Sequence, residues 1–349
     1  MAGSGTAHLR PEGDALLRVE HLVVEFPVGR SGLKVNAVTD VSLDIVEGET
    51  LGLVGESGCG KSTTGRAIVQ LPKPTSGSVK LDGQELTDLT GEALRKLRPR
   101  MQMIFQDPIS SLNPRRKVRD IVSEGLDIWS IGDKASRDAK VAEVLDTVGI
   151  DPANAERRPH EFSGGQCQRI SIARAVATDP KIIICDEPVS ALDVSVQAQI
   201  INLLRDMKER YGLTLVFIAH DLAVVKNVSD RVMVMYLGKT CEFGDPDVMY
   251  ANPSHPYTAA LLAAIPEPDP DVHPDEDKVL GGELPSPMSP PSGCRFRTRC
   301  PKAQEKCAAE EPIMREVGTD HYVACHFPLE PGEDLEFANV GVGALIEDI

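Results

Sequence analysis

A glycine-rich segment at residues 55–63 has the composition of a phosphate-binding loop. It contains the pattern G-x-x-x-x-G-K-[S/T], which follows a short apolar run and precedes a helical pattern. Its glycines let the backbone N–H groups face an anion, and the N-terminus of the following helix adds partial positive charge. Lys61 can bridge the β- and γ-phosphates of a nucleotide, and the Ser62 hydroxyl can ligate Mg²⁺. The sequence therefore predicts a nucleotide-binding set of Gly55, Glu56, Ser57, Gly58, Cys59, Gly60, Lys61, Ser62 and Thr63.

A pair of carboxylates lies where hydrolysis of a nucleotide would need it. Asp186 and Glu187 directly follow Lys181–Cys185, which has the length and branching of a buried strand. Ligands of α/β proteins bind at the carboxyl ends of such strands. Asp186 is placed to hold Mg²⁺, and Glu187 is placed to orient and polarise the attacking water. Because acidic strand ends are common, this pair indicates nucleotide hydrolysis only in combination with the phosphate loop.

A second candidate anion site lies between these two motifs. Ser163, Gly164, Gly165 and Gln166 precede an apolar-periodic helix, Ile170–Ala177. Exposed N–H groups and an N-cap hydroxyl can bind an anion there. An ordinary helix-capping loop has the same sequence, so the motif is weak by itself.

The elements that must position these residues follow from the apolar patterns. Residues 76–106 suggest short strands and turns, and residues 115–180 are mostly helical. The other predicted strands are Leu16–Phe26, Ala37–Ile45, Thr50–Val54 and Leu213–Ala219, and the other predicted helices are Lys61–Gln70 and Val194–Arg210.

Charge limits the classes of partner. The 349 residues carry a net charge of −16, which argues against general binding of nucleic acid phosphates. Two segments, Glu267–Lys278 and residues 328–349, hold much of the acidity. Because no stretch approaches the ~18 apolar residues of a membrane span, we expect a cytoplasmic protein with reduced cysteines.

Taken in order, the motifs resemble those of the ATP-binding subunits of ABC transporters. The matching residues are the phosphate loop, Gln106, Ser163–Gln166, Asp186-Glu187, Ser190–Asp193 and His220. The segments His160–Arg169, Ile184–Ser190, Asn252–Thr258 and Gly282–Pro287 resemble the oligopeptide/dipeptide importer branch, most of all the second of the two ATPase subunits of an oligopeptide permease.

This resemblance implies an ATP-hydrolysing motor for peptide import. ATP and Mg²⁺ would lie between two ATPase subunits, with Ser163, Gly164, Gly165, Gln166 and Asp193 acting in trans. The catalytic residues would be Glu187, His220, Gln106 and Lys61, and the Mg²⁺ ligands would be Ser62, Gln106 and Asp186. The partners would be two membrane permease subunits, a second homologous ATPase and an extracytoplasmic peptide-binding protein, with no nucleic acid. The chain would sit peripherally on the cytoplasmic face of the inner membrane.

The implied fold is α/β, with a RecA-like parallel core, an antiparallel β part, a helical insertion around residues 107–175 and a small C-terminal Cys-containing module. The predicted boundaries are a flexible arm at 1–14, an ABC ATP-binding domain at 15–255, the C-terminal module at 256–327 and an acidic tail at 328–349. The residue that stacks on adenine is not evident. Phe26 is the nearest aromatic side chain, and packing in the core is its alternative role.

Four clustered cysteines need a separate explanation. Cys294, Cys300, Cys307 and Cys325 could form disulfides, a Cys₄ zinc site, unligated core thiols or an iron–sulfur cluster. We favour a [4Fe–4S] cluster, because four thiols match its ligand number and because similar importer ATPases carry Cys at similar positions. Zn²⁺ is the alternative metal.

Other functions stay open at this level. The same motor could import another solute, such as nickel or glutathione. A soluble ABC protein of translation or DNA repair is a second alternative, but such proteins usually fuse two ATPase domains or carry a long coiled coil. A nucleotide sensor without turnover is a third, and the intact Glu187 and His220 argue against it.

Overall fold

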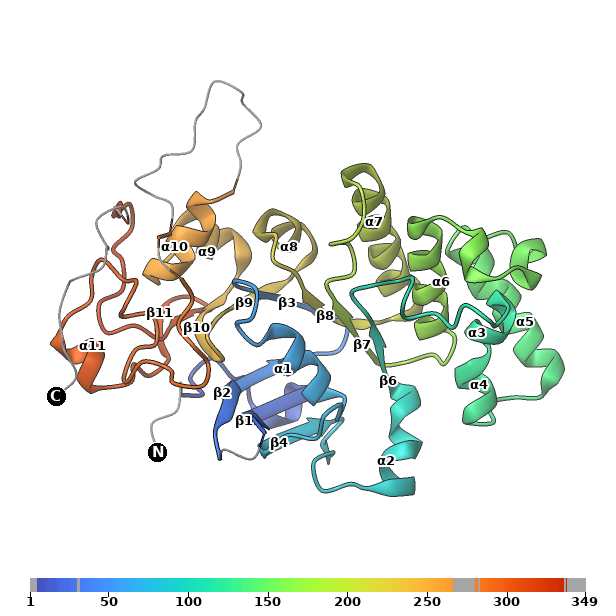
Figure 1. The fold of residues 1–349 in the computed structure, drawn as a ribbon, viewed down its shortest axis with the longest axis horizontal. Coiled ribbons are helices and arrows are strands. Elements are labelled where there is room, and N and C mark those ends of the chain that lie inside the picture. The colour runs from blue at the N-terminus through green and yellow to red at the C-terminus, as the bar shows by residue number, and fades with distance from the viewer. Residues whose placement is uncertain (1–4, 30–31, 266–279, 282, 336, 338–349) are drawn as a thin grey trace. The chain divides into compact units, whose positions relative to one another are not determined.

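The computed structural model describes residues 5–29, 32–265, 280–281, 283–335 and 337 (Figure 1). The chain divides into two units. The first unit comprises Met1–Asp44, Leu51–Thr87 and His220–Ile349, and the second comprises Ile45–Thr50 and Asp88–Ala219. The predicted acidic segment Glu267–Lys278 and most of the predicted acidic tail lie outside the described residues.

An antiparallel sheet forms one part of the first unit. Its order is β2-β1-β4-β5, and β1 pairs antiparallel with β4. Along β1, buried and half-buried residues alternate over most of its length, as expected for a sheet with one covered face. The bounds are β1 Leu17–Pro27, β2 Lys34–Ile45, β4 Ser76–Leu81 and β5 Gln84–Glu85. The predicted antiparallel part is confirmed.

A second run of strands in the first unit has the order β11-β12-β10-β9-β3. Strands β3 and β9 pair in parallel and are buried at every residue, which explains why both are apolar after a polar first residue. The remaining pairs are antiparallel. The bounds are β3 Thr50–Val54, β9 Arg231–Tyr236, β10 Lys239–Gly244, β11 Arg315–Gly318 and β12 His321–Val323.

The C-terminal region is built into this unit. Its strands β11 and β12 extend the sheet from β10, so a separate C-terminal Cys-containing module is not confirmed. In the N-terminal segment predicted as a flexible arm, His8 is buried, and its Nε2 lies 2.7 Å from the Ser42 carbonyl oxygen. The helices of the unit are η1 Glu12–Asp14, α1 Lys61–Ile68, α8 Leu222–Val228, α9 Pro246–Ala251, α10 Pro256–Ala263 and α11 Glu305–Ala309.

The second unit contains parallel strands in the order β8-β7-β6. Their bounds are β6 Met101–Ile104, β7 Ile182–Asp186 and β8 Thr214–Ile218. Every residue of β7 and β8 is buried. The predicted parallel core is confirmed.

Helices make up the rest of the second unit, and α3 and α5 both pack against α6 (Figure 1). This arrangement confirms the predicted helical insertion. Helix α2 was not predicted, because its segment was expected to form strands and turns. The bounds are α2 Gly91–Leu97, η2 Arg98–Arg100, α3 Val118–Val122, α4 Glu124–Ile128, α5 Lys134–Thr147, η3 Pro152–Glu156, η4 Pro159–Glu161, α6 Gly164–Val176 and α7 Val194–Tyr211.

Within the part of the chain that the structure describes, no helix has both the length and the apolar character that a membrane span requires.

Candidate nucleotide-binding and catalytic site

The phosphate loop connects β3 to α1 in the first unit. Gly55 has φ +146°, and a Cβ there would lie 2.1 Å from the carbonyl oxygen of Met235. Gly60 has φ +106°, and a Cβ there would lie 2.3 Å from the carbonyl oxygen of Ala37. A side chain at either position would collide with backbone, so this path of the loop requires glycine. Strand–loop–helix is the context that the sequence motif predicted.

Lys61, the first residue of α1, is folded onto the loop. Its side chain is buried, and Nζ donates to the carbonyl oxygens of Gly55 at 2.7 Å and Glu56 at 3.0 Å. Nζ also lies 3.8 Å from Cys59 Sγ. The ammonium group is therefore held inside the curve of the loop, where a phosphate could compete with these neutral acceptors for it.

Two further loop residues have clear environments. Ser62 is half-buried in the first turn of α1, which suits a hydroxyl that binds a metal ion. Cys59 is fully buried, and burial raises the pKa of its thiol. Cys59 therefore stays protonated, which argues against the reactive thiolate that oxidation would need.

The carboxylate pair lies in the second unit, at the end of β7. Asp186 is fully buried. Glu187 has φ +47°, an uncommon conformation for a residue with a side chain, and its N–H donates to the Ile218 carbonyl oxygen at 3.0 Å. Gln106 Nε2 donates to Glu187 Oε2 at 2.7 Å. The structure thus brings together Gln106 and Glu187, which are 81 residues apart in the sequence and which the motifs assign to one site.

Residues predicted to act in trans also lie in the second unit. Ser163 is the N-cap of α6, and its Oγ accepts from the Gln166 N–H while Gln166 Oε1 accepts from the Ser163 N–H. This capping box confirms the helix-capping role, and both side chains remain exposed to solvent. Asp193 is the N-cap residue of α7 but makes no side-chain capping bond, and it is also exposed.

His220 and Phe26 belong to the first unit. His220 lies two residues after the end of β8, and its side chain is exposed. Phe26 lies near the end of β1 with 39% of its surface exposed, so it is not a core residue. An exposed aromatic ring can stack on a base.

Three of the four clustered cysteines have a raised pKa. Cys294, Cys300 and Cys325 each have a pKa raised mainly by burial, to about 12, about 12 and about 11, with neighbouring thiols of the cluster adding to each rise. The N–H of Cys294 donates to the Cys307 carbonyl oxygen at 2.8 Å. Among the described residues, however, no group of three or more His, Cys, Asp or Glu side chains is arranged to hold a metal ion. The predicted cluster therefore has no support from the geometry.

Sequence reasoning missed contacts between the phosphate loop and the C-terminal region. Tyr257 Oη accepts from the Glu56 N–H at 2.7 Å. Arg299 Nη1 and Nη2 donate to the two Glu56 carboxylate oxygens at 2.7 and 3.1 Å. No local sequence signal marks pairs that are 201 and 243 residues apart.

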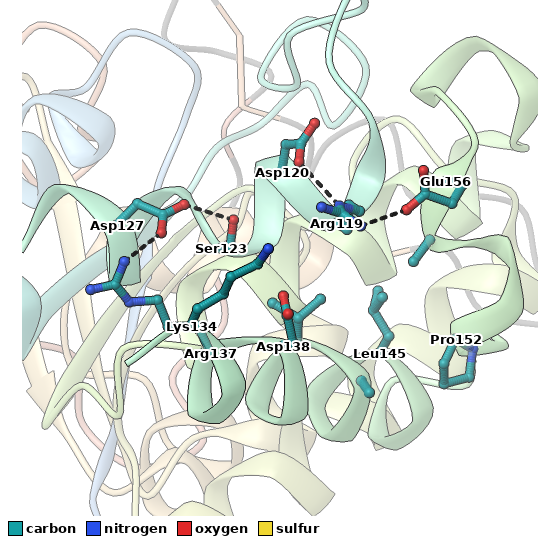
Figure 2. A pocket seen from close by; sticks show the side chains of 13 residues that line it. Arg119, Asp120, Ser123, Asp127, Lys134, Arg137, Asp138, Leu145, Pro152 and Glu156 are labelled. Carbon is teal, nitrogen blue, oxygen red and sulfur yellow. Dashed lines mark hydrogen bonds and ion pairs between the residues drawn. The ribbon is translucent and has the colours of Figure 1, made fainter. Parts of the chain in front are cut away.

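It also missed a groove in the helical part of the second unit, with a volume of about 510 Å³ (Figure 2). Its lining includes Val141, Ala142 and Leu145 together with charged residues of both signs. Ion pairs hold four of its charged lining residues: Arg137 with Asp127 at 2.8 Å and Arg119 with Glu156 at 2.8 Å.

Comparisons with known proteins agree with the geometry. The ABC transporter family matches residues 38–190, and the C-terminal region of the oligopeptide/dipeptide transporter family matches residues 241–307. A putative peptide import ATP-binding protein of Brucella ovis is 51% identical over 310 residues, covering 89% of this chain and 97% of that protein. The oligopeptide transport ATP-binding protein OppF of Salmonella typhimurium is 54% identical, covering 83% of this chain and 87% of that protein.

Solved structures support the same fold. A dimeric ATP-binding cassette in a post-hydrolysis state, bound to ADP and Pi, has a TM-score of 0.60 and 30% identity, covering 66% of this chain and 98% of that one. The chain belongs to the ABC transporter ATP-binding proteins. Within that class it carries the C-terminal region of the oligopeptide/dipeptide transporters, which confirms the resemblance seen in the sequence.

Proposed function

We propose that the chain is the ATP-hydrolysing subunit of an importer for oligopeptides or dipeptides. The observation that carries this proposal is that a single chain joins an intact phosphate loop to a C-terminal region of the oligopeptide/dipeptide transporter type. The names of the relatives, which refer to peptide import and oligopeptide transport, support peptides as the cargo.

In this proposal the loop and Lys61 bind the phosphates of ATP. The loop residues Gly55, Glu56, Ser57, Gly58, Cys59, Gly60, Ser62 and Thr63 surround them. Lys61 exchanges its bonds to two loop carbonyls for bonds to phosphate oxygens, and these charge-assisted bonds are the stronger ones. The helix N-terminus contributes N–H groups and a partial positive charge.

Oxygen donors are available for Mg²⁺, which suits a hard cation. We propose Ser62, Gln106 and Asp186 as the residues that would hold it. Mg²⁺ would neutralise charge on the phosphates during their transfer.

Glu187 and His220 are the proposed partners of the attacking water. Glu187 would accept a proton from it, while the bond from Gln106 holds the carboxylate in one orientation. His220 would donate a hydrogen bond near the γ-phosphate. Across a pair of ATPase subunits, the exposed Ser163, Gln166 and Asp193 and the half-buried Gly164 and Gly165 would contact the nucleotide of the partner.

The proposed partners are two membrane permease subunits, a second homologous ATPase and an extracytoplasmic peptide-binding protein. The chain would then lie on the cytoplasmic face of the inner membrane. We propose that the groove of Figure 2 receives a short cytoplasmic segment of a permease subunit. A lining that mixes apolar residues with side chains of both charge signs suits an amphipathic segment.

Filling the groove tests this assignment. Ala142 lines the groove and is exposed, so Ala142→Trp obstructs the groove without displacing core residues. We expect unchanged ATP binding by the isolated chain and lost co-purification with the permease subunits. Ala139→Trp is the matched control, because Ala139 is exposed on the same helix but does not line the groove. Normal assembly of the Ala142→Trp variant would refute this role.

For Cys294, Cys300, Cys307 and Cys325, we retain a [4Fe–4S] cluster as the proposal and Zn²⁺ as its alternative. The raised pKa values of Cys294, Cys300 and Cys325, to which neighbouring thiols contribute, and the bond from the Cys294 N–H to the Cys307 carbonyl oxygen support a common neighbourhood. The present arrangement of these residues forms no metal site. The test is iron, sulfide and zinc content of anaerobically prepared protein. A colourless preparation that lacks all three would refute both metals.

The main proposal is tested with Lys61→Ala in the assembled transporter. We expect ATP turnover and peptide uptake to be lost together, because the ammonium group that binds the phosphates is missing. Uptake at the normal rate in this variant would contradict a motor role for this chain.

A further inference from the structure

The first turn of the phosphate loop is held by residues from the C-terminal region of the chain. Glu56 is anchored at its main chain and at its side chain, through Tyr257 and Arg299 respectively. All of these residues belong to the first unit. Resting on the proposed ATP-binding function, we propose that Arg299 and Tyr257 are positioning residues that keep the loop in its nucleotide-binding shape.

The ion pair is well formed. Arg299 presents two nitrogens to two carboxylate oxygens, the bidentate geometry that gives strong and directional pairs. The Arg299 side chain is only 6% exposed, and that of Glu56 is 30% exposed. Arg299 Nε donates to the Gly281 carbonyl oxygen at 3.1 Å, so the guanidinium group is itself held in place. Partial burial and a fixed donor make this pair more effective than a surface salt bridge.

The second anchor is a rigid hydroxyl. Tyr257 is fully buried, and its ring packs against Tyr236 and Phe296 with centroid distances of 4.8 and 5.3 Å. At the start of α10, His255 Nδ1 accepts from the Tyr257 N–H at 3.0 Å. The Tyr257 hydroxyl therefore has little freedom to leave the Glu56 N–H.

These anchors matter most when Lys61 moves. Its Nζ now donates to the Gly55 and Glu56 carbonyl oxygens, and binding a phosphate requires the ammonium group to give up part of these bonds. Glu56 would then lose one of its contacts inside the loop. The N–H bond to Tyr257 and the ion pair to Arg299 would remain, so the loop would not have to be reordered by the nucleotide.

The prediction is a loss of nucleotide affinity with little change in turnover. For Arg299→Gln we expect the Kd for MgATP and the KM each to rise about tenfold, as for loss of a hydrogen-bonded charged pair. We expect kcat to stay within about twofold of the unsubstituted value. Arg299→Lys should recover part of the affinity, because one charged donor remains. Tyr257→Phe should weaken affinity about threefold and accelerate amide exchange at Glu56.

Matched controls come from the same region. Arg297→Gln changes an arginine that donates to Ser292 rather than to the loop, and Tyr322→Phe removes a hydroxyl that has no part in the anchors. Both should match the unsubstituted chain. Thermal unfolding of every variant checks that affinity is compared among folded proteins.

A double-mutant cycle decides whether Arg299 acts through Glu56. Equilibrium binding of a fluorescent ATP analogue to the full chain is measured for Glu56→Gln, Arg299→Gln and the double variant. We expect the double variant to bind the ATP analogue as tightly as whichever single variant has the lower affinity for it. Additive losses, or unchanged affinity with a lowered melting temperature, would overturn the proposal. Because binding is measured without turnover, failure of ATP hydrolysis in the unsubstituted assembled transporter would count against the proposed function and not against the anchors.

Discussion

Replacing Glu187 with Gln separates nucleotide binding from hydrolysis. The amide has nearly the same shape as the carboxylate, and its oxygen can still accept the bond from Gln106 Nε2, now 2.7 Å long. The backbone conformation at φ +47° and the bond from the Glu187 N–H to Ile218 do not depend on the side-chain charge. The fold and ATP affinity should therefore change little.

The change removes the group that accepts a proton from the attacking water. General-base catalysis typically contributes about 10²–10⁴ to a rate, which corresponds to roughly 2.7–5.5 kcal/mol of barrier. Replacing a charged acceptor by a neutral one at Gln106 costs about 1 kcal/mol of local stability, which is too small to unfold the chain. We therefore expect kcat to fall at least a hundredfold at unchanged Kd for ATP.

The assay measures phosphate release and equilibrium ATP binding on the same preparation of the assembled complex. Glu209→Gln is the matched control, because Glu209 is an exposed glutamate on α7 of the same unit. Turnover of the Glu187→Gln variant within threefold of the unsubstituted complex would refute the assignment of Glu187 as the base. A parallel loss of ATP affinity would instead show that the residue acts in binding.

Three further predictions concern stability and reactivity. Burial lowers the pKa of His255 from 6.5 to about 4, so between these pH values the unfolded chain binds a proton that the folded chain does not. As the pH drops from 6.5 to 4, the free energy of unfolding from chemical denaturation should therefore fall by about 3 kcal/mol more in the unsubstituted chain than in His255→Asn. Gly52→Ala would place a Cβ 2.4 Å from Val225 Cγ1 in a buried strand, so urea unfolding should show a loss of about 1–3 kcal/mol, and an unchanged midpoint would contradict this packing. Burial raises the pKa of Cys185 to about 12, so iodoacetamide at pH 8 should alkylate this thiol far more slowly in the folded chain than in urea, and equal rates would contradict the burial.

Much of the nucleotide site follows from local sequence. Strand β3 spans Thr50–Val54 and α1 begins at Lys61, as predicted, because a buried parallel strand and a glycine loop leave strong local signals. The end of α1 differs from the prediction: the helix stops at Ile68, two residues before the predicted end at Gln70. Gln70 itself adopts φ +60°, which is not a helical conformation. Motif order assigned Gln106 and Glu187 to one catalytic set, and the bond between their side chains is a contact that spacing alone does not give.

The missed elements lack such signals. Helix α2 is seven residues long with no buried residue, so it shows no apolar periodicity. Strand β11 is exposed at all four positions and therefore has no alternation to detect. The contacts of Glu56 with Tyr257 and Arg299 join distant parts of the chain and depend on tertiary packing. Four nearby cysteines matched the ligand count of a cluster, but ligand number in a sequence does not fix the geometry that a metal needs.

The most direct test of the account is peptide-stimulated ATP turnover by the complete transporter in lipid vesicles. The complex would contain this chain, its partner ATPase, both permease subunits and the peptide-binding protein. The account predicts that adding a peptide on the side of the binding protein raises ATP hydrolysis several-fold, and that Glu187→Gln in this chain suppresses the increase. A rate of ATP hydrolysis that neither rises on addition of peptide nor falls in the Glu187→Gln variant would contradict the claim that this chain drives peptide import.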